Sequence, residues 1–268
     1  MARVVVALVV ALIGAGACIW IRAPLPWLIG PLVVVAMASM LNVRLAAPPA
    51  ARQLGQWAIG VALGLYFSPH VVREVVRLAP WLLLGIVFAV ILGGLGAWLL
   101  RRMTDTDETT AFFAMAIGGA SEMATQAQRH GGQVERVAAA HSLRIMLVVL
   151  IVPLSFNLLQ VHGLDPYVPL ALSFDPVGFA VLVAVTLGAA VVMERFGSPN
   201  SWMIGPLLTA AAITATGHIF SSLPVAVVNA GQLLIGISLG THFTPEFFRA
   251  APRYLAVVAL ITLAYLLS

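Results

Sequence analysis

One arginine inside a long apolar stretch is the strongest candidate for chemistry in this sequence. Arg144 lies in an apolar run that continues to Pro153. A charge at such a place is costly unless it is paired or solvated, so it marks a functional site by default. His141 precedes it by one helical turn and shares its face. The nearest counter-charge on a neighbouring segment is Glu122, and we expect the three side chains to cluster around a polar cavity.

Glu122 belongs to a segment, residues 108–130, whose pattern is not that of one regular helix. An apolar run from Ala111 to Ile117 leads into Gly118-Gly119-Ala120-Ser121-Glu122. This predicts two half-helices that meet at Gly118 and Gly119, with Ser121 capping the second and Glu122 in its first turn. Such a break within a membrane must be buried or face a water-filled cavity. Thr125 and Gln126 add neutral hydrogen-bonding groups.

Two interpretations of this cluster stay open. In the functional one, Arg144 and the second half-helix N-terminus attract an anionic group, and Glu122 or His141 carries a coupled proton. In the structural one, Arg144 extends to the membrane surface or ties the broken segment down through a buried ion pair.

The composition identifies the elements that must position these residues. Of the 268 residues, 61% are hydrophobic and 9% are charged, and the mean hydropathy is +1.03. These values exclude an ordinary soluble enzyme, a disordered chain and a fibrous one. The sequence predicts an all-α integral membrane protein. The net charge of +4 comes from arginines alone. Because they are scattered between apolar runs, they indicate membrane topology and no nucleic-acid partner.

About nine transmembrane helices are expected from the apolar runs. Crossing about 30 Å of hydrocarbon takes roughly 20 residues. Three runs reach that length, at Val4–Ile21, Ala79–Leu100 and Val137–Leu159. Shorter runs lie at Trp27–Leu41, Gln53–Phe67, Val177–Val192, Trp202–Thr216, Val225–Thr241 and Tyr254–Leu267. The first run resembles a signal peptide, but it has a counterpart in mid-chain, so we take it as the first transmembrane helix.

The chain contains an internal repeat. A shift of about 175 positions aligns Pro24, Trp27, Ile29, Gly30, Pro31, Leu32 and Ala36 with Pro199, Trp202, Ile204, Gly205, Pro206, Leu207 and Ala211. One further position aligns Gly55, Gln56, Ile59, Gly60, Leu63 and Gly64 with Gly231, Gln232, Ile235, Gly236, Leu239 and Gly240. We assign residues 1–161 to the first repeat and 176–268 to the second, which lacks a counterpart of the broken segment and of its following helix. Such repeats are typical of secondary transporters.

The repeated motifs carry further candidate residues. Trp27 and Trp202 are expected to anchor spans at the membrane surface. The Gly30-Pro31 and Gly205-Pro206 pairs are expected to interrupt helices, and matching interruptions point to a binding site. Gln56 and Gln232 indicate either a symmetric polar pair or ordinary hydrogen bonds between helices.

The arginines favour an inverted repeat. If the broken segment enters the membrane and returns, ten arginines lie on one side and three on the other. If it crosses, the division is five against eight. The first arrangement satisfies the positive-inside rule and places the N-terminus in the cytoplasm.

The sequence gives little support to an enzyme. The six histidines form no His-x-His or His-x-x-x-His pair, and Cys18 is the single cysteine. We therefore expect no metal, no cofactor and no catalytic residue. Neither a Gly-x-Ser-x-Gly motif nor a phosphate-binding loop is present.

The duplicated Pro-x-x-Trp-x-Ile-Gly-Pro-Leu motif, with Gly118-Gly119-Ala120-Ser121-Glu122-Met123 and His141-Ser142-Leu143-Arg144, resembles the bacterial membrane AbrB-duplication family. The resemblance covers almost the whole chain. It implies a link to regulation of gene expression and the labels ammonia monooxygenase and AbrB-family transcriptional regulator; the histidine pattern argues against the first. Members usually carry the Gly-Gly-x-Ser-Glu-Met segment in both halves, whereas this chain ends at Ser268. A naturally short chain, a truncated one and completion by a partner subunit all stay open.

We therefore expect a secondary transporter or exporter of a small metabolite with an anionic group, in the bacterial inner membrane. The alternative is a membrane sensor that affects gene expression indirectly. A sensor needs a cytoplasmic surface through which to signal, but the longest polar stretches of this chain are too short to fold alone, which favours transport. The expected partners are the lipid bilayer and an unidentified small molecule, and a homo-oligomer stays open.

Overall fold

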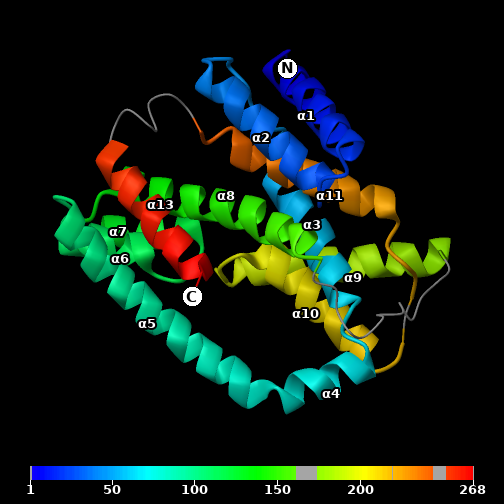
Figure 1. Cartoon of the computed structure of the whole chain (residues 1–268). Helices are drawn as coiled ribbons and strands as arrows, with labels where there is room; N and C mark the ends of the chain where they lie inside the picture. Colours follow the sequence, from blue (N-terminus) through cyan, green and yellow to red (C-terminus); the bar gives the residue numbers. More distant parts are fainter. Residues whose placement is uncertain (1, 161–173, 219, 244–251, 268) are drawn as a thin grey trace. The chain divides into compact units, whose positions relative to one another are not determined.

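A computed structural model of the chain describes residues 2–160, 174–218, 220–243 and 252–267 (Figure 1). Within these ranges the protein is built from twelve helices and contains no strand. The all-α prediction is therefore confirmed. The chain divides into two compact units, residues 1–35, 45–79 and 162–240 in unit 1, and residues 36–44, 80–161 and 241–268 in unit 2. Each unit takes segments from both predicted repeats.

Unit 1 contains most of α2 and the helices α1, α3, α4, α9, α10 and α11 (Figure 1). Their bounds are α1 Ala2–Trp20, α2 Pro26–Met40, α3 Ala51–Gly64, α4 Pro69–Arg77, α9 Pro176–Arg195, α10 Ser201–Ala215 and α11 Val225–Gly240. Unit 2 contains α5 Ala79–Met103, α6 Glu108–Met115, α7 Ala120–Arg129, α8 Val134–Leu158 and α13 Pro252–Leu267.

Four of the described helices, α1, α5, α8 and α9, are long and apolar enough to cross a membrane. The helices α3 and α4 are long and apolar enough only when taken together, and the chain bends by 87° between them. Four more apolar helices, α2, α10, α11 and α13, have only 15 or 16 residues. The structure thus supports a helical membrane protein, and the number of nine spans stays a prediction.

Glycines let the helices of unit 1 cross at backbone distance. An ideal Cβ on Gly55 of α3 would lie 2.8 Å from the carbonyl oxygen of Gly231 in α11. A Cβ on Gly231 would lie 3.3 Å from the carbonyl oxygen of Gly55. Because the two residues are counterparts in the sequence alignment, α3 and α11 cross at equivalent points. Small residues at such crossings are typical of membrane helices.

The neighbouring glycines make contacts that follow the same alignment. A Cβ on Gly60 of α3 would lie 2.5 Å from the Met203 oxygen in α10, and one on Gly236 of α11 would lie 2.8 Å from the Leu28 oxygen in α2. Gly60 and Gly236 are counterparts, and so are Met203 and Leu28. The third helix of each sequence copy therefore packs against the second helix of the other copy.

Backbone turns recur at the same spacing. Arg22 and Leu25 have φ values of 54° and 45°, and Gly197 and Asn200, about 175 positions later, have φ values of 69° and 53°. The left-handed region is unfavourable for most residues other than glycine and asparagine. Two segments of different sequence thus make the same turn between helices.

One expectation about the repeated motifs is wrong. Pro31 and Pro206 lie inside the continuous helices α2 and α10, so the Gly-Pro pairs do not interrupt them. Each proline is the sixth residue of its helix and removes one hydrogen bond near the start, which a short helix tolerates when it is packed. Gly30 and Gly205 instead allow the close approach of the preceding helix, at Gly14 and at Ala189.

Trp27 and Trp202 are half-buried, and their role as anchors at the membrane surface stays a prediction. Trp27 packs against a cluster that includes Ala7, Val35 and Ile237, and Trp202 packs against one with Trp57 and Leu182. By contrast, Trp81 of α5 is 70% exposed. The two motif tryptophans therefore hold helices together within unit 1.

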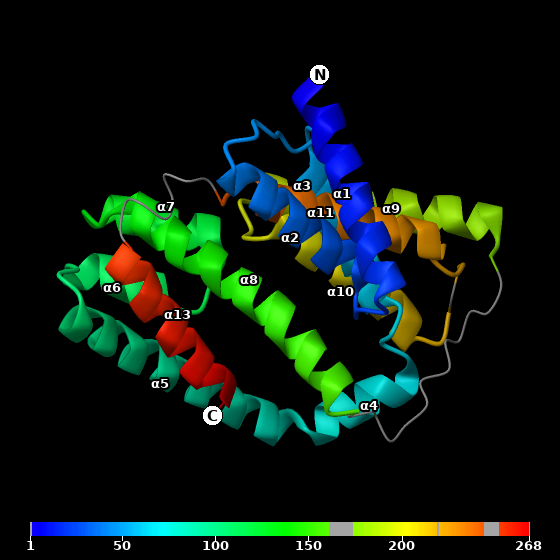
Figure 2. The same cartoon turned by 45° about the horizontal axis from the view of Figure 1, so that its top comes forward.

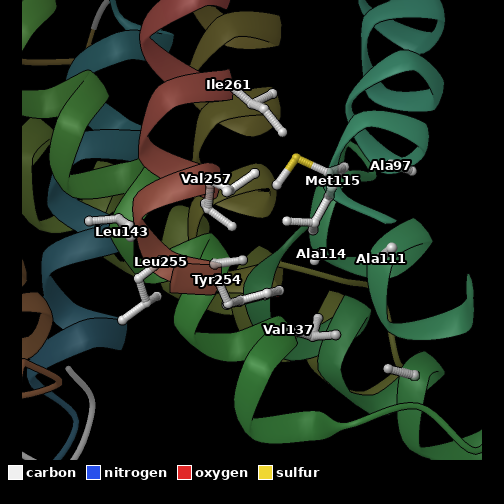
Figure 3. Close-up of a cluster of buried hydrophobic side chains, with 14 of the residues drawn as sticks. Ala97, Ala111, Ala114, Met115, Val137, Leu143, Tyr254, Leu255, Val257 and Ile261 are labelled. Atoms are coloured by element: carbon white, nitrogen blue, oxygen red, sulfur yellow. The ribbon is translucent and has the colours of Figure 1, made fainter. Parts of the chain in front are cut away.

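The core of unit 2 joins α5, α6, α7, α8 and α13 (Figures 2 and 3). Small side chains dominate where α6 meets α5 and α8, with Ala97, Ala111, Ala114 and Ala140 buried around Met115. This lets the short α6 lie close to longer neighbours. It fixes the broken segment against α8, which carries His141 and Arg144.

Candidate functional site

The broken segment has the predicted two half-helices. The first, α6, ends at Met115 and the second, α7, begins at Ala120, with residues 116–119 between them. The capping prediction is wrong, because the N-cap of α7 is Gly119 and no side chain caps the helix there. Ser121 lies one residue inside the helix, and its side chain is outside the described part. The predicted position of Glu122 in the first turn is confirmed.

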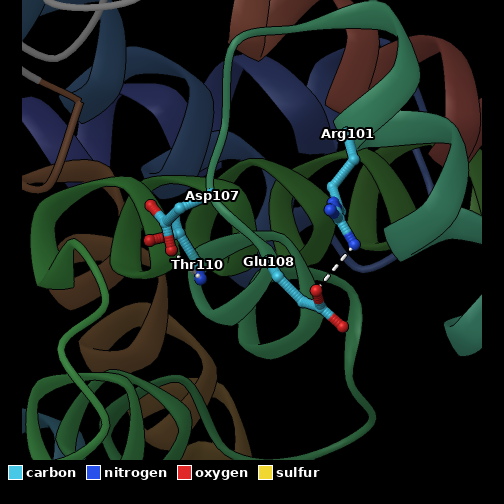
Figure 4. Close-up of polar contacts among 4 residues, drawn as sticks. All are labelled: Arg101, Asp107, Glu108 and Thr110. Carbon is cyan, nitrogen blue, oxygen red and sulfur yellow. Dashed lines mark hydrogen bonds and ion pairs between the residues drawn. The ribbon is translucent and has the colours of Figure 1, made fainter.

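The start of α6 is held by local polar contacts (Figure 4). Asp107 is the N-cap, and its carboxylate accepts a 2.8 Å hydrogen bond from the Thr110 backbone N–H and a 3.3 Å bond from the Gln133 amide. Partial burial raises the pKa of Asp107, but these hydrogen bonds outweigh it and hold the pKa below its usual value. Arg101 of α5 forms a 2.9 Å ion pair with Glu108.

The end of α6 is held by the two candidate residues of α8. Arg144 Nη1 donates to the carbonyl oxygens of Ala114 and Ala116, at 3.2 Å each. His141 Nε2 lies 2.9 Å from the carbonyl oxygen of Phe113. The last carbonyls of a helix have no partner within it and carry partial negative charge, so a guanidinium is a favourable donor. These bonds support the structural interpretation, in which Arg144 ties the broken segment down. The partners of Arg144 are carbonyl oxygens, whereas the sequence predicted an ion pair with a carboxylate.

Glu122 folds back over the break. An ideal Cβ on Gly119 would lie 1.8 Å from Glu122 Oε2 and 2.8 Å from its carboxyl carbon. The same oxygen is buried and has no hydrogen-bond partner. Met123 fills the corresponding space at Gly118, where a Cβ would lie 2.7 Å from its Cε atom. The side chains of the first turn of α7 therefore fold back onto Gly118 and Gly119, while the break itself stays exposed.

Glu122 and Arg144 do not form the predicted ion pair. Neither of the described ion pairs, Arg77–Glu74 and Arg101–Glu108, includes Arg144. Its described hydrogen bonds go to the neutral carbonyls of Ala114 and Ala116, and it lies near the Tyr265 hydroxyl of α13. Both Glu122 and Arg144 lie close enough to His141 to act on it electrostatically. The structure thus brings the three residues to one region, with the cation left without a carboxylate contact.

The other predicted residues of α7 lie farther along the helix. Thr125 is exposed, and Gln126 is half-buried with its backbone oxygen 2.8 Å from His130 Nδ1. Within the described ranges no group of three His, Cys, Asp or Glu residues could hold a metal ion.

In unit 1, Gln56 and Gln232 do not pair with each other. Gln56 donates a 2.8 Å hydrogen bond to Asn200 Oδ1 at the start of α10. Its neighbour Trp57 donates a 3.0 Å bond to Thr186 of α9. The symmetric pair is therefore wrong, although α3 and α11 cross at the neighbouring Gly55 and Gly231, and Gln56 makes the alternative, an ordinary hydrogen bond to another helix start.

Comparisons with known proteins identify the family to which the chain belongs. The profile of the family described as "Transition state regulatory protein AbrB" matches residues 27–268. The chain belongs to the AbrB family. A relative from Bacillus subtilis (strain 168), "Uncharacterized protein YhjN", is 25% identical over 86% of this chain and 66% of its own length. "Putative regulator AbrB" of Escherichia coli (strain K12) is 23% identical over 92% of this chain and 71% of its own length. No solved structure matches.

This AbrB-family chain thus spans about two thirds of the length of these relatives. The family resemblance expected from the motifs is confirmed. Sequence reasoning missed the partners of Arg144 and His141, since backbone carbonyls leave no mark in a sequence. It also missed α4, although the spacing of Arg73, Glu74 and Arg77 among valines is an amphipathic signal.

Proposed function

We propose that this AbrB-family protein is a secondary transporter of a small metabolite with an anionic group, in the bacterial inner membrane. The observation that carries the proposal is Arg144, a half-buried guanidinium beside a helix break with no carboxylate in contact. A cation that is held there by neutral carbonyls retains its attraction for an anion.

The break supplies a second attraction. The N-terminus of α7 has no side-chain cap, and its first backbone N–H groups together carry partial positive charge. The opposite end of the break is already neutralised, because Arg144 and His141 bond the carbonyls of α6. An anion at residues 116–119 would therefore meet a guanidinium and a helix N-terminus together.

The matched contacts of unit 1 support a transporter built from two similar repeats. Gly60 and Gly236 contact equivalent carbonyls, and the turns at Leu25 and Asn200 share left-handed backbones. Two similar halves that pack through glycines can rock against each other without disrupting interlocked side chains, and rocking of repeats is a common route to alternating access.

Uptake into proteoliposomes tests this function. The purified protein is reconstituted into liposomes that are loaded with small carboxylates or phosphates. Exchange of the internal anion for a labelled external anion is then measured for the wild type, Arg144→Gln and Arg129→Gln. Arg129 is an exposed arginine in the last turn of α7 and serves as the matched control. We expect exchange of at least one anion by the wild type and the control, and its loss in Arg144→Gln. Equal exchange by all three would contradict the assigned site.

A second function is favoured by the printed names of the family and of the Escherichia coli relative, which describe regulators. Under this proposal the same site binds an anion, and the protein signals without moving it across the membrane. Anion binding that depends on Arg144, together with no exchange in proteoliposomes, is the result it predicts.

A further inference from the structure

The two glycines at the break are not explained by their backbones. Gly119 has φ −69° and ψ 140°, an extended conformation that alanine adopts freely. No positive φ is recorded for Gly118 or Gly119, in contrast to Gly131. The reason for glycine must therefore lie in the space beside it.

That space at Gly119 is filled by the carboxylate of Glu122. Its Oε2 atom lies 1.8 Å from the place where a Cβ would be. A flexible carboxylate that could turn elsewhere instead lies over the N-terminus of its own helix. The partial positive charge of that N-terminus accounts for its position.

The carboxylate is nevertheless weakly held. Its Oε2 atom is buried and receives no hydrogen bond. A buried oxygen without a donor costs about 1–3 kcal/mol of desolvation. The carboxylate thus occupies a favourable electrostatic position without the hydrogen bonds that would fix it there.

We infer that Glu122 is a tethered competitor for the substrate's anionic group, and that this group is a carboxylate. The inference rests on the proposed function. A substrate carboxylate occupies the position beside Gly119 that the Glu122 carboxylate holds in the empty protein, at the α7 N-terminus and on the other side of the break from Ala116, whose carbonyl Arg144 bonds. Binding therefore requires that the Glu122 side chain turns away.

Two groups of α8 lie near the break. Glu122 and Arg144 both act electrostatically on His141, and Arg144 bonds the Ala116 carbonyl. Arg129 and His130 lie at the far end of α7.

Acetate is the probe, with acetamide as its uncharged counterpart and chloride held constant. Its dissociation constant is obtained from thermal unfolding of the purified full chain in detergent. The proteins are the wild type, Glu122→Gln and Gly119→Ala. Gly119→Ala keeps the carboxylate but displaces it, and only a flexible side chain has to move.

Both variants should bind acetate about tenfold more tightly than the wild type, as expected if the competitor occupies the site about nine-tenths of the time. A circular-dichroism spectrum and a single elution peak confirm that each variant is folded.

Equal affinities of all three proteins would overturn this inference and leave the proposed function standing. Weaker binding by Glu122→Gln would also overturn it, since Glu122 would then be part of the site. No acetate binding by any of the three would overturn the carboxylate assignment, while the exchange assay with the wider anion panel would still decide the proposed function separately.

Discussion

At the scale of single residues, the site is defined by groups that bond backbone atoms. Arg144 and His141 hold the last carbonyls of α6, and Asp107 accepts a hydrogen bond from the Thr110 N–H in its first turn. An eight-residue helix is too short to be stable alone. Its shape therefore depends on these side chains, which serve the structure and, for Arg144, the proposed site.

Asp107 gives a pH-dependent prediction. Its pKa is lowered in the folded protein, so its contribution to stability is complete well above pH 3.8 and is lost as the pH falls through the folded pKa. Asp107→Ala should lower the free energy of unfolding by about 1 kcal/mol at neutral pH, and Asp107→Asn by less. Thermal unfolding at pH 7 and near pH 3 measures both. An equal loss for Asp107→Ala at the two pH values would contradict the capping role.

Arg144→Lys separates bonding geometry from charge. Lysine keeps the positive charge but not the planar guanidinium, whose one nitrogen bonds two carbonyls. We expect the variant to retain part of the anion affinity and to lose stability by about 1–3 kcal/mol. Arg144→Gln should lose both. A fully stable Arg144→Lys would show that the carbonyl bonds do not hold α6.

At the scale of elements, the two equivalent interfaces of unit 1 differ in chemistry. On the α3 side, Gln53, Gln56 and Trp57 bond Glu194, Asn200 and Thr186. The positions equivalent to Trp57 and Thr186 on the α11 side are Leu233 and Ala11, which are buried in an apolar cluster. Among the described residues, the Trp57–Thr186 hydrogen bond on the α3 side thus has an apolar counterpart, Leu233 and Ala11, on the α11 side.

Thr186→Val tests the polar side. It leaves the buried Trp57 N–H without an acceptor, so we expect a loss of about 1–3 kcal/mol. The double variant with Trp57→Phe should recover part of that loss, since both partners are then apolar. Additive losses in this cycle, measured by thermal unfolding, would contradict the coupling.

Gly60→Ala tests the close crossing of α3 and α10. Its Cβ would lie 2.5 Å from the Met203 oxygen, so backbones must separate and we expect a loss of about 1–3 kcal/mol. Gly188→Ala on α9 is the matched control, because a Cβ there meets nothing within 4 Å. The control should be neutral or stabilising. A stable, folded Gly60→Ala protein would contradict the crossing.

The elements could be predicted because hydrophobic runs, caps and repeats are local signals. The half-helices at residues 108–130 followed from Gly118 and Gly119, and the run at Ala79–Leu100 became α5. The role of Gly30-Pro31 was not predictable, because a proline near a helix start is tolerated only when packing compensates for it. Likewise, no pattern shows that Glu122 turns onto its own helix.

At the scale of the whole molecule, the central claim is that the break is a transport site. A transporter exposes its site to each side of the membrane in turn, whereas a sensor needs access from one side only. This difference does not depend on the identity of the substrate. Access can be measured at the broken segment itself, because a cysteine can be placed within residues 108–130.

The most direct measurement is therefore the labelling of Ala120→Cys, in a Cys18→Ser background, with a membrane-impermeant thiol reagent. The protein is reconstituted in one orientation, and the reagent is added to one side or to the other. Ala120 is half-buried at the start of α7, beside the break. We predict labelling from both sides, slowed by an anion that binds. Labelling from one side alone would contradict transport through this site and favour the sensor.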